Sequence, residues 1–234
     1  MVVSVSLISY PPAKRRWAFG RMGLDRPDLR STPGLGFRRM VGTAQGRSLA
    51  WKPDLLRWGL IACWDNEEHL DEFLAESPIA ARWREHASEV WTTRMIPIKS
   101  VGEWGGTNPF TAAEDTPEDG PCAVITRATL RARHTKSFHS AVPAIDLDLA
   151  RAHGLLSSVG FGESPVVHQG TLTLWKSQAA MREFAYGTAA HREAMRRRTD
   201  ERWYSEELFA RFRPVSSEGT WGGVDPLAGL TTPT

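Results

Sequence analysis

An internal repeat is the feature that most limits what this chain can fold into. Residues 64–73, WDNEEHLDEF, have a counterpart in residues 175–184, WKSQAAMREF, with Phe nine positions after Trp in both. In each copy an apolar strand ends at the Trp, and a helix begins on polar residues. Residues 102–110, GEWGGTNPF, likewise match residues 219–227, GTWGGVDPL. Ordered matches at a long spacing indicate that one structural unit occurs twice in tandem.

Two shorter matches extend the repeat. Residues 89–91 pair with residues 201–203, since both end in Trp after a Glu two positions earlier, and residues 41–43 pair with residues 159–161. The offset between copies varies slightly from match to match, which loop insertions explain.

Each copy has the same predicted order of elements. In the first copy we predict strands at 2–9, 36–42, 57–64 and 94–99, with helices at 18–29 and 67–87, the latter broken at Pro78. In the second copy we predict strands at 123–131, 155–160, 166–175 and 210–215, with helices at 146–153 and 178–198. Alternation such as Thr-Leu-Thr-Leu at 171–174 supports the strands. The order βαββαβ is ferredoxin-like.

The architecture follows from burying the open face of each sheet. A ferredoxin-like unit has a four-stranded antiparallel sheet with helices on one face, so its other face needs a partner. We therefore predict an α+β fold in which two tandem ferredoxin-like units form a pseudo-dimeric α+β barrel. The predicted boundaries are 1–110 for the first half, 111–121 for a linker rich in Pro and acidic residues, and 122–234 for the second half.

Composition excludes several classes of function. Apolar residues make up 41% and charged residues 24%, and the net charge of +2 comes from interspersed charges, so no charge block indicates binding to nucleic acid or to an acidic membrane. No apolar run approaches the ~20 residues of a membrane span, and the first residues lack a basic leader region, so we expect a cytoplasmic protein. Two cysteines suit buried reduced thiols. Ten tryptophans suit either an ordinary core or the wall of a flat apolar ligand site.

Ordered motifs across residues 10–227 give the chain a family resemblance. They comprise Trp17-x-Phe19-x-x-Met22, Val41-Gly42-Thr43, Trp83-Arg84-x-x-Ala87, Phe138-x-x-x-Val142-Pro143, Gly160-x-Gly162-Glu163-x-Pro165, Thr173-Leu174-Trp175, residues 191–195, residues 203–212 and residues 219–226. In this order they resemble the spheroidene monooxygenase (acyclic carotenoid ketolase) family. Two positions depart from the expected pattern, because His139 replaces a Trp and Ala44 replaces a Gly.

The resemblance implies a haem enzyme. Members of that family are regarded as binding haem b and as oxygenating an unactivated carbon, here with O₂ or peroxide and an electron donor. The second half is then the candidate haem-binding half, and the substrate is a small to medium, partly apolar molecule. The departures bear on the carotenoid substrate more than on the cofactor. Assembly into a homo-oligomer is compatible with the sequence, although no specific interface signal marks it.

Seven histidines could supply the axial ligand that a haem iron needs, and His191 is our choice. It lies in the second helical region of the second copy, with Ala194, Met195 and Arg198 on the same face. We assign Met195 and Arg198 as further haem contacts. Small residues nearby would let a flat macrocycle approach the helix. The counterpart in the first copy is near Arg82, so the repeat has diverged here. The alternative is a histidine making an ordinary polar contact on a helix flank.

Two further residues are candidates for catalysis. His168 begins a predicted strand, where it could act as a distal acid or base or be an ordinary edge histidine. Arg127 alternates with apolar residues on a predicted central strand, so its inward guanidinium must be paired by a haem propionate, a bound anion or an ordinary ion pair. His139 ranks third among the histidines. We expect these groups around a porphyrin-sized cavity between the two halves, with His191 pointing into it.

Two other classes of protein remain open. A haem-iron aldoxime dehydratase, or another N–O chemistry, needs the same pocket and a distal acid. A cofactor-free barrel, either a monooxygenase-like enzyme or a small-molecule binding protein, would use the tryptophans as its walls. Haem binding separates the second class from the others.

Overall fold

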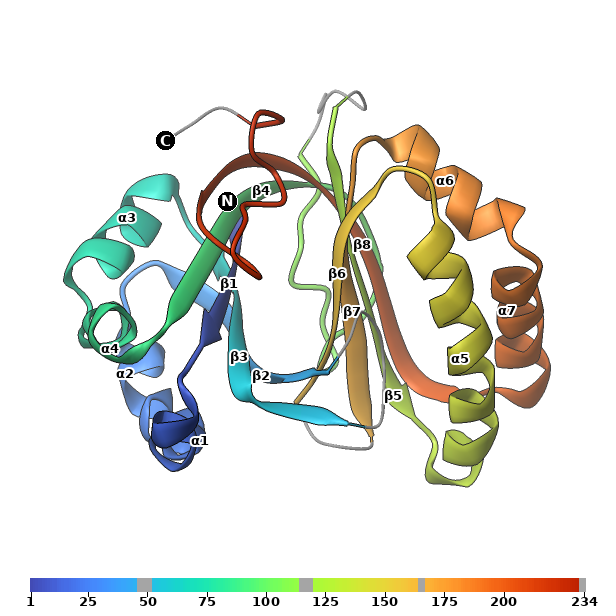
Figure 1. The fold of residues 1–234 in the computed structure, drawn as a ribbon, viewed down its shortest axis with the longest axis horizontal. Helices are drawn as coiled ribbons and strands as arrows, with labels where there is room; N and C mark the ends of the chain where they lie inside the picture. The colour runs from blue at the N-terminus through green and yellow to red at the C-terminus, as the bar shows by residue number, and fades with distance from the viewer. Residues whose placement is uncertain (46–51, 114–119, 164–166, 232–234) are drawn as a thin grey trace.

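The computed structural model describes residues 1–45, 52–113, 120–163 and 167–231. The first half contains strands β1 (Val2–Ser9), β2 (Leu35–Ala44), β3 (Pro53–Trp64) and β4 (Glu89–Gly102). Its helical segments are η1 (Pro12–Lys14), α1 (Arg15–Leu24), α2 (Arg26–Ser31), α3 (Glu67–Glu76) and α4 (Pro78–His86). Figure 1 shows these helices on one face of the first sheet.

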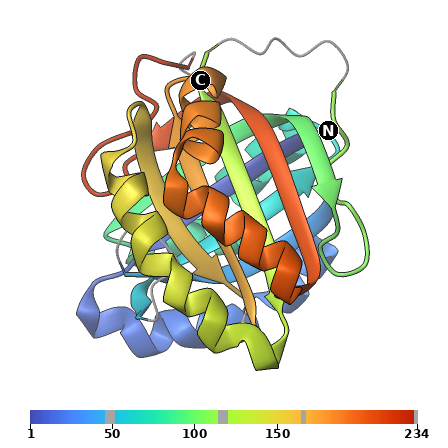
Figure 2. The same ribbon diagram turned by 90° about the vertical axis from the view of Figure 1, so that its right-hand side faces the viewer.

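The second half repeats this order. Its strands are β5 (Cys122–Leu130), β6 (Leu155–Gly162), β7 (His168–Trp175) and β8 (Tyr204–Gly219). Its helical segments are η2 (Ala132–His134), α5 (Thr135–Arg151), α6 (Gln178–Gly187) and α7 (Ala189–Glu201). Figure 2 looks onto this helical layer, with α5, α6 and α7 in front of the sheet.

The eight strands close into one antiparallel barrel in the order β1-β3-β2-β6-β7-β5-β8-β4. Each half contributes four neighbouring strands in the ferredoxin-like order, β4-β1-β3-β2 and β8-β5-β7-β6. A long seam joins β4 to β8, from Trp91↔Gly219 to Gly102↔Leu208, and a short one joins β2 to β6 through two residue pairs. The prediction of an α+β barrel built from two tandem ferredoxin-like units is therefore confirmed.

Reciprocal hydrogen bonds between the two halves explain the repeated Trp-Gly-Gly sequence. The Glu206 carboxylate, on β8, accepts hydrogen bonds from the backbone N–H groups of Gly105 and Gly106, and Glu89, on β4, does the same for Gly222 and Gly223. All four glycines have positive φ, between 69° and 84°, which lets consecutive N–H groups converge on one carboxylate. Each half thus holds the segment that leaves the other half's edge strand.

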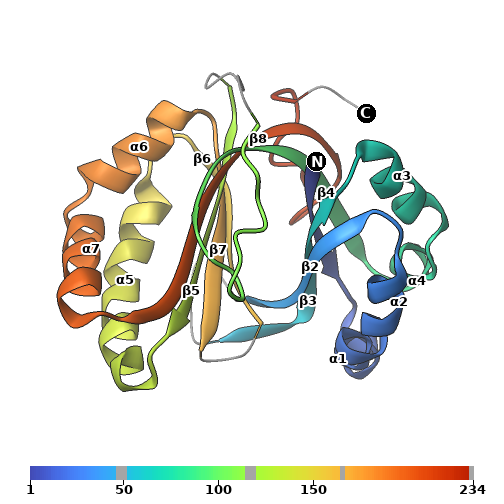
Figure 3. The same cartoon turned by 180° about the vertical axis from the view of Figure 1, so that it is seen from behind.

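These two segments close the barrel from opposite sides. The one after β4 crosses the barrel in Figure 3, and the one after β8 crosses it in Figure 1. They place Trp104 and Phe110, and correspondingly Trp221 and Leu227, in the barrel core. The predicted match of residues 102–110 with 219–227 is confirmed. The match of 89–91 with 201–203 is wrong, because Trp91 lies inside the barrel while Trp203 lies under the helices; Glu206 is the counterpart of Glu89.

Several predicted elements are longer in the structure. Both β4 and β8 extend well beyond residues 94–99 and 210–215, because pairing across the seam between the halves holds their ends. Helix α5 begins at Thr135 rather than 146 and contains Pro143, since buried Phe138, Val142 and Leu149 continue one apolar face past the proline. The predicted helix at 18–29 is two helices that meet at Asp25. Residue 166 and most of the predicted linker lie outside the described residues, and the half boundaries stay a prediction.

None of the helices in the described ranges is long and apolar enough to cross a bilayer. The 17-residue helix α5 carries Lys136, Asp146, Asp148 and Arg151.

Candidate active site

The interior of the barrel is filled by packed side chains. Twenty-one buried residues form one cluster there, among them Trp91, Trp104, Phe161, Phe212 and Trp221. The Trp104 ring stacks on Phe161 with centroids 5.9 Å apart, and the Trp91 and Trp221 centroids are 5.4 Å apart. The prediction of a porphyrin-sized cavity between the two halves is therefore wrong. The reason is that the segments after β4 and β8 bring large aromatic side chains into that space.

The outer, helix-covered faces of the two sheets differ, although the repeat relates them. In the first sheet Leu60, Ser6 and Thr92 form one row across β3, β1 and β4, and each is only 2% exposed. The corresponding row of the second sheet is Thr171, Thr126 and Phe209. There Thr171 is half-buried, Thr126 is exposed and Phe209 is 38% exposed. The helices of the second half thus leave the middle of their sheet uncovered.

Hydrophobic packing shows the same gap. One cluster covers the whole outer face of the first sheet, from Val2 to Ile8 along β1. On the second sheet the packing is split in two. One cluster gathers around Cys122, Val124 and Trp175, and the other around Leu130, Phe138 and Trp203. Thr126 lies between them on β5. We call Thr126, Thr171 and Phe209 the uncovered floor.

The sequence of α7 accounts for this gap. Helix α4 in the first half buries Ile79, Ala80 and Trp83 against its sheet. Helix α7 buries only Ala194 in thirteen residues, because its inward positions carry small or polar side chains. An alanine side chain is too short to reach a sheet that a tryptophan would cover. The space beneath α7 therefore remains open between the two clusters.

His191 lies directly between these clusters. Its ring centroid is 5.3 Å from that of Phe184, which packs with the Trp175 cluster, while Ala194, one turn further on, belongs to the Trp203 cluster. Its Nδ1 is buried, and no hydrogen-bond partner for it is present among the described residues. Burial lowers the pKa of His191 below its ordinary value, with the Asp148 carboxylate partly opposing this. The imidazole is therefore neutral at pH 7, as a metal ligand must be.

The other two α7 candidates have different surroundings. Arg198 shares the inward face with His191 and Ala194, and its Nε donates to Glu207 on β8 at 2.7 Å. This ion pair fixes the end of α7 over the sheet. Met195 is 45% exposed and points away from that face. The structure thus brings Arg198 to the His191 side of the helix but leaves Met195 at its rim.

His139 on α5 lies in the same layer between helices and sheet. It is 8% exposed, and its Nε2 is 3.5 Å from Nε2 of Gln169 on the outer face of β7. Gln169 pairs with Ala128 in the row next to the uncovered floor. Burial lowers the pKa of His139. Sequence reasoning ranked this residue third, and its departure from the family pattern was the only signal that marked it.

Arg127 and His168 lie on the opposite side of the second sheet. Arg127 points into the barrel, where its guanidinium pairs with Glu206 and lies 3.5 Å from Glu163, and its side chain is 4% exposed. Strand alternation places His168 on the same inner face, in the row of Glu206. Ordinary ion pairs thus hold the two terminal nitrogens of Arg127, while its buried Nε has no hydrogen-bond partner among the described residues. The sheet separates both residues from His191, so the five predicted site residues do not form one site.

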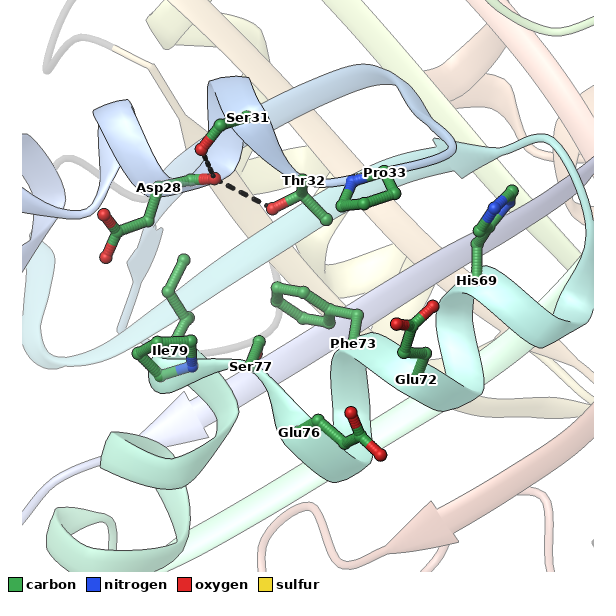
Figure 4. A pocket seen from close by; sticks show the side chains of 11 residues that line it. Asp28, Ser31, Thr32, Pro33, His69, Glu72, Phe73, Glu76, Ser77 and Ile79 are labelled. Carbon is green, nitrogen blue, oxygen red and sulfur yellow. Dashed lines mark hydrogen bonds between the residues drawn. The ribbon is translucent and has the colours of Figure 1, made fainter.

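A separate pocket of about 330 Å³ lies in the first half, between α2 and the α3–α4 corner (Figure 4). Phe73 and Ile79 form its apolar floor, while Asp28, Glu72 and Glu76 make its rim acidic. None of its lining residues comes from the second half. It is therefore unrelated to the site around His191.

Comparison with known proteins agrees with this fold. No family model matches the chain. Spheroidene monooxygenase of Rhodobacter capsulatus is 35% identical over 97% of this chain and 95% of its own length. The enzyme of the same name from Cereibacter sphaeroides is 34% identical over 94% of this chain and 68% of its own length, and that of Rubrivivax gelatinosus is 34% identical over 95% and 85%.

Solved structures show the same architecture at low sequence identity. An aldoxime dehydratase co-crystallised with butyraldoxime superposes over 100% of this chain and 86% of its own, with a TM-score of 0.62 and 10% identity. A second aldoxime dehydratase gives a TM-score of 0.57 over 91% of this chain and 80% of its own, also at 10% identity. These likenesses concern the fold alone. The sequence identity over nearly the whole chain is decisive, and the chain belongs to the spheroidene monooxygenase family.

Proposed function

We propose that this protein is a haem-dependent monooxygenase that binds haem b between the second sheet and α5–α7, with His191 as the iron ligand. The observation that carries the proposal is the neutral, partly buried imidazole of His191 beside an uncovered floor. Family membership supports the oxygenase activity. The location differs from the expected one, because the space between the halves is filled.

The residues around this space fit a porphyrin. A haem iron in such a site needs a neutral imidazole nitrogen, a flat space on the ligand's side, and largely apolar walls. His191 supplies the nitrogen, Phe184 supplies apolar surface against its ring, and Phe209 supplies apolar surface on the uncovered floor. Phe209 is an apolar side chain left exposed on a helix-covered sheet, which a bound macrocycle would cover.

Two arginines, Arg198 on α7 and Arg211 on β8, border the uncovered floor and are suited to bind the carboxylates of a porphyrin. On the outer face of β8, Glu207 and Arg211 flank Phe209 at i−2 and i+2. Arg198 holds Glu207, and Arg211 donates to Oε1 of Gln178 at 2.7 Å. An arginine already held by a neutral or charged partner is well placed for a second contact, because its guanidinium carries five N–H donors.

The overall reaction has a fixed balance. One O₂, two electrons and two protons convert a C–H bond of the substrate to C–OH and release one water. Haem supplies the iron at which O₂ is activated when it is bound. The two electrons come from an external donor, because the chain's two cysteines are free thiols buried in different clusters, Cys63 in the barrel core and Cys122 under the helices of the second half.

The chain's own residues bind and orient the substrate and exclude water from it. Phe184 and Phe209 cover apolar substrate surface and keep water from the reacting carbon. His139 and Gln169 form a polar wall one row away, where they hold a polar group of the substrate or retain a proton on an imidazole nitrogen. We therefore propose a partly apolar substrate with one polar end. The relatives' name, which refers to an acyclic carotenoid, is in keeping with an elongated apolar molecule.

The test combines isotope labelling with a rival substrate. Haemin-loaded protein, with a chemical reductant and ¹⁸O₂, is given an acyclic carotenoid and, separately, butyraldoxime. Incorporation of ¹⁸O into the carotenoid supports the proposal, and His191→Ala should abolish it while His153→Ala, which changes an exposed histidine of the same half, should not. Dehydration of butyraldoxime without O₂ consumption would replace the proposal with N–O chemistry. Absence of both reactions in haem-loaded protein would refute it.

A further inference from the structure

Helix α1 presents an unusual surface on the outside of the first half (Figure 1). Its outward residues are Arg15, Arg16, Phe19 and Leu24, with Gly20 and Gly23 between them; we call this set the α1 face. Phe19 and Leu24 are each 64% exposed, and among large apolar side chains of the described chain only Tyr186 is more exposed. The two side chains are five residues apart, about 140° around the helix axis, so they flank the outward side of α1, with Arg16 and the two glycines between them.

The inner side of α1 is firmly packed. Ala18 is 2% exposed, and the Trp17 ring lies edge-on to Tyr10 at 5.7 Å and to His86 at 4.4 Å. Phe19 leans on Trp58 at 5.9 Å, which fixes its direction without covering it. The α1 face is therefore a preformed surface and does not have to fold when it binds a partner.

Positive charge is concentrated around this face. Residues 14–30 contain six Lys and Arg against two Asp, a net charge of +4, so the remainder of the chain carries −2 of the total +2. Asp25 is buried between Arg21 and Arg82, which neutralise it internally. Neither Arg15 nor Arg16 has an ion pair within the described ranges. The exposed part of α1 is thus positive, while the remainder of the chain carries a net charge of −2, so the expectation that no charge block favours an acidic membrane does not hold for this segment.

We propose that the α1 face docks this protein on the surface of an anionic lipid bilayer. Interfacial helices place aromatic and aliphatic side chains at the boundary between headgroups and acyl chains, while Arg side chains contact lipid phosphates. Phe19 and Leu24 provide the two apolar contacts, and Arg15 and Arg16 provide the phosphate contacts between and beside them. The inference rests on α1 alone and is independent of haem, His191 and the reaction.

Vesicle co-sedimentation tests the inference with the full chain. The probes are phosphatidylcholine vesicles with and without phosphatidylglycerol. Wild-type protein should sediment with the anionic vesicles and be released by high salt, because exposed charges are screened. Each basic residue near an anionic surface is worth about fivefold in partitioning. The double variant Arg15→Glu/Arg16→Glu should therefore lose at least about twenty-five-fold, and Phe19→Ser/Leu24→Ser at least about tenfold.

Matched controls lie elsewhere on the surface. Tyr186→Ser removes an exposed aromatic residue of α6, and Arg151→Glu reverses an exposed charge at the end of α5. Both controls should bind vesicles like the wild type, and circular dichroism confirms that all variants are folded. The inference is overturned if wild-type protein stays with the supernatant, or if the controls lose as much as the α1 variants. It is also overturned if sedimentation velocity shows a lipid-free dimer that Phe19→Ser abolishes, because a second copy then covers the face.

Discussion

Leucine substitutions at Ser6 and Thr126 test the uncovered floor, because the repeat places these two residues at matching points of the two sheets. Ser6 is 2% exposed and its hydroxyl lies 2.9 Å from that of Thr92, whereas Thr126 is exposed. We expect Ser6→Leu to be strongly destabilising. We expect Thr126→Leu to be close to neutral, because the added methyl groups enter open space.

The magnitudes follow from packing and hydrogen bonding. Extra methylene groups in a filled core cost about 1–3 kcal/mol, and leaving the Thr92 hydroxyl unsatisfied adds about 1–3 kcal/mol. Ser6→Leu should therefore lower the free energy of unfolding by about 2–6 kcal/mol, which corresponds to about 4–24 °C in Tm for a chain of this size. Thr126→Leu should stay within about 0.5 kcal/mol of the wild type.

Thermal unfolding of the haem-free protein measures both variants, with far-UV circular dichroism before heating to check the fold. Haemin addition provides a second reading, since Thr126→Leu should weaken haem uptake while leaving Tm nearly unchanged. An equal loss of Tm in the two variants would refute the reasoning, because it would mean that the second sheet is as tightly covered as the first.

The remaining predictions concern the charged groups. Arg127→Met should lower the free energy of unfolding by about 1–3 kcal/mol, because half-buried Glu206 loses its cation whereas Glu163 keeps Arg39. Urea unfolding measures this, with exposed Arg151→Met as a control that should change little. Burial favours the neutral form of Glu206, but the N–H groups of Gly105 and Gly106 and the Arg127 guanidinium outweigh it and lower its pKa. The stabilisation by ionised Glu206 is therefore present above the unfolded-state pKa of about 4.3, and it is lost as the pH falls through the lower folded-state pKa. The urea midpoints of wild type and Glu206→Gln should differ most above about pH 4.3 and converge in acid. Because the pKa of His191 is lowered in the folded protein, its imidazole takes up a proton more readily in the unfolded chain. Haem-free protein should therefore lose stability as the pH falls below about 6.5, and His191→Gln should remove part of that loss. A pH profile of stability that is unchanged in His191→Gln would contradict the burial of this ring.

The repeat made the architecture predictable. Residues 102–110 and 219–227 match because each Trp-Gly-Gly segment forms the same turn, whose N–H groups donate to Glu206 or Glu89. Each segment also places the same kind of aromatic or aliphatic side chain in the barrel core. The match of Trp91 with Trp203 was misleading, because the sequence does not show whether a tryptophan side chain faces the barrel interior or the helices. The full lengths of β4 and β8 depend on pairing between the halves, which local patterns do not contain.

The site was less predictable than the fold. The helical periodicity around His191 and its divergence from the first copy identified a residue that the structure places beside an uncovered floor. The sequence did not show which side of the sheet holds the open space, because that depends on whether the α7 side chains reach the strands. It also grouped Arg127 and His168 with His191, although strand alternation turns them to the inner face.

Haemin titration with imidazole rescue is the most direct test of a haem site at His191. Wild-type protein should take up one haem per chain and show a Soret band. His191→Gly should bind haemin at least about a hundredfold more weakly, since even the partners that orient a ligating histidine are worth tenfold to a hundredfold. Added imidazole should fill the space left by the side chain and restore the band. A Soret titration that is unchanged in His191→Gly, or wild-type protein that takes up no haemin, would contradict the proposed site.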